Sequence, residues 1–313
     1  MTWAGSPVTM VRMRDLLFSV AADVGSAVEA RWIVARAAGI TASDLLTRLD
    51  KEVAPEVSAA VQAMVDRCLA GEPLQYVLGT WSFRTLELSV DRRVLIPRPE
   101  TEQVVAVALD ELSVQSRRLG AAAHLVAVDL GTGSGAIALA LASEFGGALG
   151  SEPAPSGPFE VWATDVSRGA LDVLEENLVA LARRRPEAGA RVRVGEGPWF
   201  DALPATLAGT VALVVSNPPY VSEAEWEGLE PMVRDHEPKT ALVPGPTGLE
   251  AIEALLRDAV RWLAPGGSLV VELAPGQADE MRQRAAELGY DQTDVRGDLA
   301  GRPRTLVARL PVS

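Results

Sequence analysis

Four consecutive residues, Asn217-Pro218-Pro219-Tyr220, are the part of the sequence best suited to holding a nitrogen group for a reaction. Prolines have no backbone N–H, so their carbonyl oxygens remain free acceptors in a stiff loop, and the Asn217 side chain adds an amide oxygen. A planar –NH2 group has two hydrogens, of which the Asn217 side chain and the Pro218 carbonyl could accept one each. The ring of Tyr220 could then pack on the flat substrate.

Such a loop favours methylation of an amide or amino nitrogen. An amide nitrogen is a poor nucleophile because its lone pair is delocalised, and accepting both of its hydrogens returns electron density to it. Positioning against an electrophilic methyl group supplies the rest, without a strong general base. We therefore predict Asn217, Pro218 and Tyr220 as catalytic residues and Asn217-Pro218-Pro219-Tyr220 as the substrate-binding site.

A glycine-rich turn earlier in the chain is the predicted cofactor site. It lies between an apolar run and a helical stretch, and its residues are Gly131, Thr132, Gly133, Ser134 and Gly135. Glycines permit positive φ angles and let a ligand approach the backbone closely. By itself the turn fits a dinucleotide, S-adenosylmethionine or a tight turn without any ligand.

Further residues complete this predicted cofactor site. Asp165 ends the next apolar run, where a carboxylate can accept the ribose hydroxyls of an adenosine cofactor, although it could also be the N-cap of the following helix. Trp199 could stack on an adenine ring or pack in the core. Together with Asn217, these residues predict binding of S-adenosylmethionine, which needs an adenine slot and room for a sulfonium. Glu100 and Glu102 either reach the methionine end of that cofactor or favour a helix N-terminus.

The elements that must position these residues alternate between strands and helices from His124 onward. This alternation predicts a parallel sheet covered on both faces. The last two runs are joined by a segment too short for a crossover helix, so they should be antiparallel. The predicted strands are Leu125–Leu130, Phe159–Thr164, Val192–Val194, Val211–Ser216, Ser268–Leu273, Asp291–Val295 and Thr305–Leu310. The predicted fold is thus α/β, a Rossmann-like class I methyltransferase sheet of seven strands with the last antiparallel.

The residues before the sheet have a different pattern. Residues 8–72 are predicted to form a small helical bundle, in which apolar residues recur at helical spacing through Met13–Ala38. Tyr76–Phe83 and Leu86–Val90 alternate around a short turn, which predicts a β-hairpin.

These patterns predict the division of the chain into domains. We expect an N-terminal helical domain at 1–73, a linking β-hairpin at 74–97 and the methyltransferase domain at 98–313. Gly146–Pro158 is rich in Gly, Pro, Ser and Ala, and we interpret it as a surface insertion.

The composition disfavours several other classes of protein. Its 29 Lys and Arg against 42 Asp and Glu give a formal net charge of −13, whereas proteins that grip duplex nucleic acid usually carry a basic surface. Cys68 is the only cysteine, which excludes an intramolecular disulfide and fits a reducing cytoplasm. With only two histidines, no zinc site is expected. No signal peptide or membrane-spanning run is expected either.

With these motifs, the sequence resembles the HemK/PrmC family, the glutamine N5-methyltransferases of peptide chain release factors. Asn-Pro-Pro-Tyr is shared with DNA adenine methyltransferases, and the Ile96–Glu102 segment makes the resemblance more specific. The residues that carry it span most of the chain: Glu72–Tyr76, Leu95–Glu102, Asp129–Ala140, Trp199-Phe200, Ser216–Tyr220, Glu237-Pro238, Ala241-Leu242, Gly248-Leu249 and Gly297–Arg302. Pro198 departs from the family, which often has Asp immediately before the stacking Trp.

The resemblance implies a target and a partner. The target would be the glutamine of the Gly-Gly-Gln motif in class I peptide chain release factors, and the N-terminal helical domain would help to dock that protein. We expect a cytoplasmic monomer that contacts neither membrane nor nucleic acid. Two alternatives remain open: methylation of a glutamine on a ribosomal protein, and N6-adenine methylation of nucleic acid, because adenine and glutamine both present a planar –NH2.

Overall fold

The computed structural model describes residues 11–120, 122–145 and 157–312. In it the chain forms two compact units. The first holds the described residues up to Gly79 together with residues 231–236, and the second holds the remainder of the chain. The predicted insertion Gly146–Pro158 lies outside the described residues except for its last two. The domain boundaries proposed from the sequence remain predictions.

The first unit is helical, as its apolar spacing predicts. Its helices are α1 (Met13–Val24), α2 (Ala27–Ala38), α3 (Ala42–Leu46), α4 (Pro55–Leu69), α5 (Leu74–Leu78) and α11 (Pro231–His236). The core is formed by α1, α2 and α4 around buried Ile33, Val34 and Val61. Cys68 is half-buried against this core, and burial raises the pKa of its thiol. These surroundings are those of a small apolar side chain, not of a nucleophile.

A β-hairpin opens the second unit, and it is shorter than predicted. Strands β1 (Thr80–Phe83) and β2 (Leu86–Ser89) pair antiparallel, with Thr80 opposite Ser89. The assignment of Tyr76–Leu78 to a strand is wrong, because these residues form part of α5. All three are buried, and Gly79, with a φ of 72°, ends the helix in the left-handed conformation.

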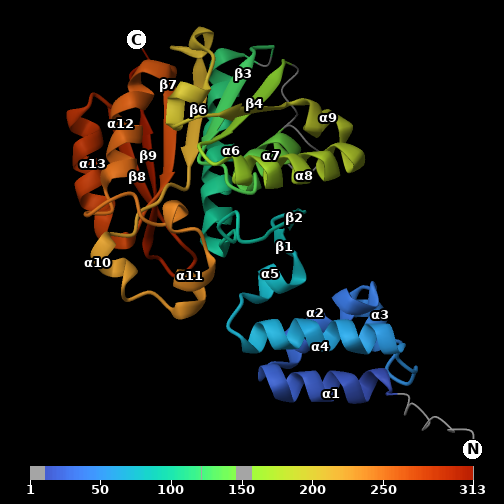
Figure 1. Ribbon diagram of the computed structural model, residues 1–313. Coiled ribbons are helices and arrows are strands. Elements are labelled where there is room, and N and C mark those ends of the chain that lie inside the picture. The colour runs from blue at the N-terminus through green and yellow to red at the C-terminus, as the bar shows by residue number, and fades with distance from the viewer. Residues whose placement is uncertain (1–10, 121, 146–156, 313) are drawn as a thin grey trace, which may run out of the picture. The chain divides into compact units, whose positions relative to one another are not determined.

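The sheet of the second unit has seven strands (Figure 1). In spatial order they are β5 (Val192–Glu196), β4 (Phe159–Asp165), β3 (Leu125–Leu130), β6 (Val211–Ser216), β7 (Leu263–Glu272), β9 (Pro303–Arg309) and β8 (Gln292–Gly297). The first five run parallel, and β9 is antiparallel to both of its neighbours. The predicted seven strands and the antiparallel ending are therefore confirmed. The order reverses between β3 and β6, which is where open α/β sheets bind ligands.

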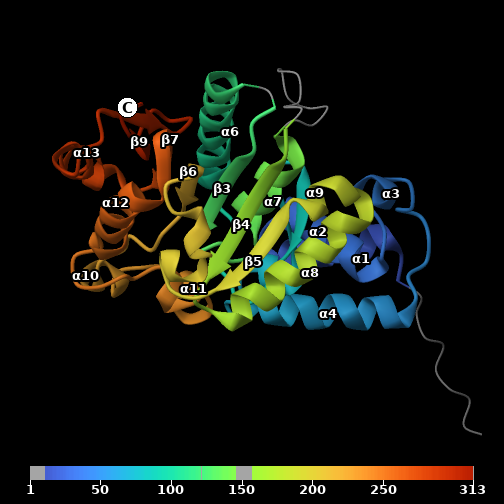
Figure 2. The ribbon, with the colours of Figure 1, turned by 90° about the horizontal axis from the view of Figure 1, so that it is seen from above.

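Helices cover both faces of this sheet (Figures 1 and 2). Leu125 and Ala127 of β3 pack with α6 (Pro99–Leu119), α7 (Ala136–Glu144) and α8 (Arg168–Arg184). The alternating residues Val126 and Val128 pack with α12 (Glu250–Trp262) and α13 (Ala278–Glu287) on the opposite face. Every residue of β3 and of β6 is consequently buried, which explains why both strands are almost entirely apolar in the sequence, with Asp129 and Ser216 as the polar exceptions.

Short elements complete the unit. They are the helices α9 (Pro186–Ala190) and α10 (Glu223–Trp226) and the 3-10 turns η1 (Trp199–Ala202), η2 (Ala205–Leu207), η3 (Lys239–Ala241) and η4 (Pro275–Gln277). Within residues 11–120, 122–145 and 157–312, no helix has the length and apolar character needed to cross a membrane.

Candidate active site

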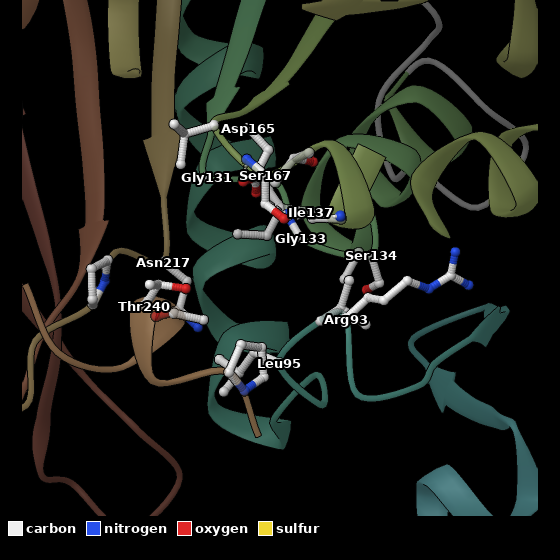
Figure 3. Close-up of a pocket in the computed structure, with 18 of the residues that line it drawn as sticks. Arg93, Leu95, Gly131, Gly133, Ser134, Ile137, Asp165, Ser167, Asn217 and Thr240 are labelled. Atoms are coloured by element: carbon white, nitrogen blue, oxygen red, sulfur yellow. Dashed lines mark hydrogen bonds between the residues drawn. The ribbon is translucent and has the colours of Figure 1, made fainter. Parts of the chain in front are cut away.

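A cavity of about 260 Å³ lies where the chain leaves the carboxyl ends of β3, β4, β5 and β6. The predicted site residues around it are Gly131, Thr132, Gly133, Ser134, Asp165, Trp199, Asn217 and Pro219. Figure 3 shows Asn217 and Thr240 on one side of the cavity, and Asp165 and Ser167 on another. The fold thus brings together residues that are far apart in the sequence.

Backbone hydrogen bonds fix the glycine-rich turn. Gly131 and Gly133 have φ angles of 71° and 56°, which other residues adopt at a cost. The amides of Gly131 and Thr132 both donate to the Thr164 carbonyl, each over 2.9 Å, and this ties the turn to the end of β4. These bonds hold the exposed backbone of Gly131 at the cavity wall.

Gly135 differs from the other residues of the turn, because it does not line the cavity. It precedes α7 with a φ of 86°, and a Cβ there would lie 2.4 Å from Cδ1 of Leu174. Its lack of a side chain is therefore required by packing between α7 and α8. The predicted contact of Gly135 with a cofactor remains a prediction.

Asp129 is a functional candidate that the sequence reasoning did not single out. Its fully buried carboxylate accepts hydrogen bonds from the Thr132 hydroxyl over 2.6 Å and from the Ala138 amide over 3.0 Å. In the described part of the chain its Oδ1 atom has no hydrogen-bond partner. Burial raises the pKa of Asp129 to about 7. The sequence signal is a single acid near the end of an otherwise apolar run, with only Leu130 between it and the turn.

The raised pKa of Asp129 predicts a pH dependence of stability. Between the pKa of about 4 in the unfolded chain and about 7 in the folded protein, only the folded state holds the proton. The contribution of Asp129 to the unfolding free energy should therefore fall by up to roughly 4 kcal/mol as the pH rises across this window. Urea unfolding at pH 4.5 to 8 should show a steeper fall for the wild type than for Asp129→Asn, which has no carboxylate. If the unfolding free energies of the wild type and of Asp129→Asn changed equally with pH, the prediction would be contradicted.

The backbone holds the Asp165 carboxylate at the cavity. Its Oδ2 accepts from the Gly133 amide over 3.0 Å and its Oδ1 from the Ser167 amide over 2.9 Å. Burial raises the pKa of Asp165, and these amides oppose the rise. The N-cap of α8 is Ser167, whose hydroxyl accepts from the Ala170 amide, so the alternative role of Asp165 as N-cap is wrong. Each carboxylate oxygen keeps a lone pair that can accept from a hydroxyl.

Trp199 and Phe200 follow β5 and point to different surroundings. Phe200 is buried and stacks on Trp262, with ring centroids 5.7 Å apart. Trp199 is half-buried, lines the cavity and lies over the turn, since a Cβ on Gly131 would be 3.7 Å from its ring. The positive φ of Trp199, 46°, is unusual for an aromatic residue.

No carboxylate stands beside Trp199 on its N-terminal side. Pro198 lines the cavity, and the nearest preceding acid, Glu196, is exposed and does not line it. Glu196 instead lies 3.8 Å from Arg168. The departure at Pro198 is therefore not compensated by Glu196.

The Asn217–Tyr220 loop begins where β6 ends. The Ser216 hydroxyl donates to the Leu130 carbonyl over 2.6 Å and joins the ends of β6 and β3. Asn217 and Pro219 line the cavity, whereas buried Pro218 and half-buried Tyr220 do not.

Tyr220 is held as a hydrogen-bond donor. Its hydroxyl donates to Glu272 over 3.3 Å, and burial together with that carboxylate raises the pKa of Tyr220. Tyr220 therefore stays protonated at neutral pH and is no general base. Its backbone carbonyl accepts from Gln277 over 3.0 Å, which anchors the end of the loop.

The two acids considered for the methionine end of a cofactor do not line the cavity. Glu100 lies in the first turn of α6, 3.6 Å from Arg302. Glu102 accepts from the Arg84 amide over 2.8 Å and fixes the hairpin turn on α6. The reading of both as residues that favour the helix N-terminus agrees with this placement.

A buried carboxylate organises the rim of the cavity. Glu237 accepts from the Ile96 amide over 3.2 Å and from the Arg98 guanidinium over 2.5 Å. These bonds join the segment of Pro97 to that of Pro238, and both prolines line the cavity. In the three described stretches of chain, no cluster of three or more His, Cys, Asp or Glu could hold a metal ion.

Comparisons with known proteins give the family. Residues 20–79 match the PrmC N-terminal domain. A release factor glutamine methyltransferase of Rhodopirellula baltica is 34% identical over 305 residues, which are 96% of each chain. The chain belongs to the release factor glutamine methyltransferases. A relative with the same name from Streptomyces coelicolor is 40% identical over 247 residues, 79% of each chain.

This family of methyltransferases uses S-adenosylmethionine, and the sheet topology is that of the class I fold. Among solved structures, the release-factor-specific protein-(glutamine-N5) methyltransferase of Alicyclobacillus acidocaldarius is 26% identical. The match covers 69% of this chain and 94% of that one, with a TM-score of 0.37.

Proposed function

We propose that the enzyme transfers a methyl group from S-adenosylmethionine to the side-chain amide nitrogen, N5, of a glutamine. The target is the glutamine of the Gly-Gly-Gln motif in class I peptide chain release factors. The observation that carries this proposal is the position of Asn217, whose amide lies at the wall of the cavity that the glycine-rich turn also lines. The proposed cofactor site and the proposed substrate site, which must be adjacent for methyl transfer, therefore line the same cavity.

The residues around the cavity fit S-adenosylmethionine. Gly131 and Gly133 leave room at the turn, Asp165 can accept from ribose hydroxyls, and Trp199 offers an aromatic surface for adenine. The buried carboxyl group of Asp129 lies beneath the turn and fixes it by accepting from the Thr132 hydroxyl. When bound, the cofactor supplies an electrophilic methyl group.

The loop after β6 binds and orients the glutamine. The Asn217 side chain and the Pro218 carbonyl accept the two hydrogens of the target –NH2 and turn the face of its nitrogen toward the methyl donor. Tyr220, held by Glu272, packs beside the amide plane. We further propose that the enzyme is a cytoplasmic monomer that contacts no membrane and no nucleic acid, in keeping with its net charge of −13.

Transfer of a labelled methyl group tests the proposal. The enzyme is incubated with labelled S-adenosylmethionine and, in separate reactions, a class I release factor, ribosomal proteins and duplex DNA. We expect label on the release factor, located by peptide mapping to the Gly-Gly-Gln glutamine, and no label when that glutamine is replaced. Label on ribosomal protein or DNA, with none on the release factor, would overturn it.

Asp165→Ala should weaken binding of S-adenosylmethionine. The change removes a charged acceptor for hydroxyls and leaves the Gly133 amide without its partner, so the dissociation constant should rise about 10- to 100-fold. Isothermal titration calorimetry measures it. Asp172→Ala, on α8 but outside the cavity lining, is the matched control and should bind as the wild type does. If both variants bound S-adenosylmethionine with equal affinity, Asp165 would not be a cofactor-binding residue.

A further inference from the structure

Three side chains from distant parts of the sequence form a hydrogen-bonded chain that ends at Asn217. The Nδ2 atom of Asn217 donates to Oγ1 of Thr101 over 3.2 Å, and the Thr101 hydroxyl donates to Oε2 of Glu272 over 2.7 Å. Thr101 and Glu272 are almost fully buried, with exposed fractions of 3% and 1%. Thr101 comes from the first turn of α6 and Glu272 is the last residue of β7.

The single hydroxyl hydrogen of Thr101 determines which way the Asn217 amide faces. A carboxylate without a proton can only accept, so the Glu272 carboxylate takes the Thr101 hydrogen. The oxygen of Thr101 can then only accept from its other neighbour. Asn217 must present its –NH2 group there, which leaves its Oδ1 atom free to accept from a ligand.

No other group competes for the freed oxygen. Across the described residues, Oδ1 of Asn217 has no hydrogen-bond partner within the protein. Asn217 and Thr101 both line the cavity. An acceptor is what the hydrogens of a target –NH2 group require, whereas the flipped amide would present two N–H donors to them.

We propose that Glu272 and Thr101 are positioning residues that hold the Asn217 amide with its oxygen toward the substrate nitrogen. The proposal rests on the proposed function, since it assumes that Asn217 accepts from the target amide. It adds a role for two residues that do not touch that amide: they select one of two amide orientations that differ little in shape.

Glu272 also serves the other end of the substrate loop. Its second oxygen, Oε1, accepts from the Tyr220 hydroxyl over 3.3 Å. The carboxylate therefore holds both Asn217, through Thr101, and Tyr220. Burial raises the pKa of Glu272, and the hydrogen bond from Thr101, the positive charge of Arg304 and the hydrogen bond from Tyr220 oppose that rise.

Replacement of Glu272 and of Thr101 tests whether this hydrogen-bonded chain orients Asn217. Glu272→Gln supplies an –NH2 that can donate to Thr101, which frees the Thr101 hydrogen for Asn217 and permits the flipped amide. Thr101→Val removes the hydroxyl at nearly constant volume. We expect either change to lower kcat roughly 10- to 100-fold, with the dissociation constant for S-adenosylmethionine within about twofold of the wild type. Thr101→Ser, which keeps the hydroxyl, should recover most of the activity lost in Thr101→Val.

A double-mutant comparison separates orientation from a general structural role. When Asn217 is already alanine, Glu272→Gln should change the residual rate by less than about twofold, because the group that it orients is absent and the glutamine oxygen can still accept from the Tyr220 hydroxyl. Ser268→Ala is the matched control, since the Ser268 hydroxyl also donates to a buried carboxylate, that of Glu111, over 2.7 Å, away from the cavity. It should leave kcat unchanged.

The outcomes distinguish this inference from the proposed function. A wild-type enzyme that fails to label the release factor would overturn the proposed function. If the wild type labels it while Glu272→Gln and Thr101→Val keep wild-type kcat, the orientation is wrong. The proposed orientation would also be wrong if Glu272→Gln lowered kcat in the Asn217→Ala background by as much as it does in the wild type. If Glu272→Gln does not fold, kcat of Thr101→Val is compared with that of Ser268→Ala. A lower kcat in Thr101→Val alone supports the proposed orientation, and equal values overturn it.

Discussion

Asn217→Ala should lower kcat for release factor methylation by about 10²- to 10³-fold, the effect typical of removing one preorganised polar group from a reaction centre. The variant loses the acceptor that holds one hydrogen of the target nitrogen, so that nitrogen is neither fixed nor enriched in electron density. S-adenosylmethionine should still bind within about tenfold of the wild type, because the turn at Gly131 and the Asp165 carboxylate are unchanged. Single-turnover transfer of labelled methyl, together with calorimetry of cofactor binding, measures both quantities.

Asn217→Gln is the control for this prediction. It keeps an amide but places it one methylene further from the backbone, so it should also lose most of its turnover if position matters more than group identity. Both variants should melt close to the wild type, since Asn217 makes one hydrogen bond to Thr101 in the protein. Near-normal turnover of Asn217→Ala would show that another group holds the nitrogen.

The strands were predictable because the sheet is buried on both faces. Leu125–Leu130 and Val211–Ser216 are almost entirely apolar and are followed by Gly131 and Asn217, and the structure reproduces their bounds without change. The short link before the last strand predicted its antiparallel direction, because a crossover helix does not fit in it. Helix α5 was missed because three buried residues in a row at Tyr76–Leu78 look like part of a strand until Gly79 ends them.

The residues that line the cavity were predictable where they lie at or just after the carboxyl end of a strand. Asp165 ends β4, Trp199 comes shortly after β5 and Asn217 directly follows β6, and the carboxyl ends of parallel strands meet at one edge of a sheet. The sequence did not distinguish residues that line the cavity from residues that are required by packing. Gly131 and Gly135 look alike in the sequence, yet one lies at the cavity wall and the other packs against Leu174.

The hydrogen-bonded chain behind Asn217 had no signal in the sequence. Thr101 belongs to a segment whose acids, Glu100 and Glu102, attracted attention instead. Glu272 is a single acid in an apolar run, 171 residues from Thr101. Only the packing of α6 against β7 brings these two side chains together, and long-range pairing of this kind is not encoded by local periodicity.

Gly248→Ala should both destabilise the enzyme and reduce its activity. Gly248 has a φ of 81°, and a Cβ there would lie 2.6 Å from the Tyr220 carbonyl and 3.0 Å from the Ser222 amide. Both contacts are with backbone, so the loop that carries Tyr220 must move, and Gln277, which donates to the carbonyls of Tyr220 and Gly248, must follow. We expect the unfolding free energy to fall by about 2–4 kcal/mol and kcat to fall at least about tenfold.

Urea unfolding and methyl transfer on the folded protein measure these two effects of Gly248→Ala separately. Gly276→Ala is the matched control, because a Cβ at Gly276 meets no atom within 4 Å and the residue has no positive φ. It should retain both stability and turnover. Because Gly248 touches the loop only through backbone, a variant that is destabilised but fully active would show that the Tyr220 end of the loop can shift without disturbing Asn217. If kcat and the unfolding free energy both fall, the position of the whole Asn217–Tyr220 loop depends on the close approach of Gly248 to the Tyr220 carbonyl.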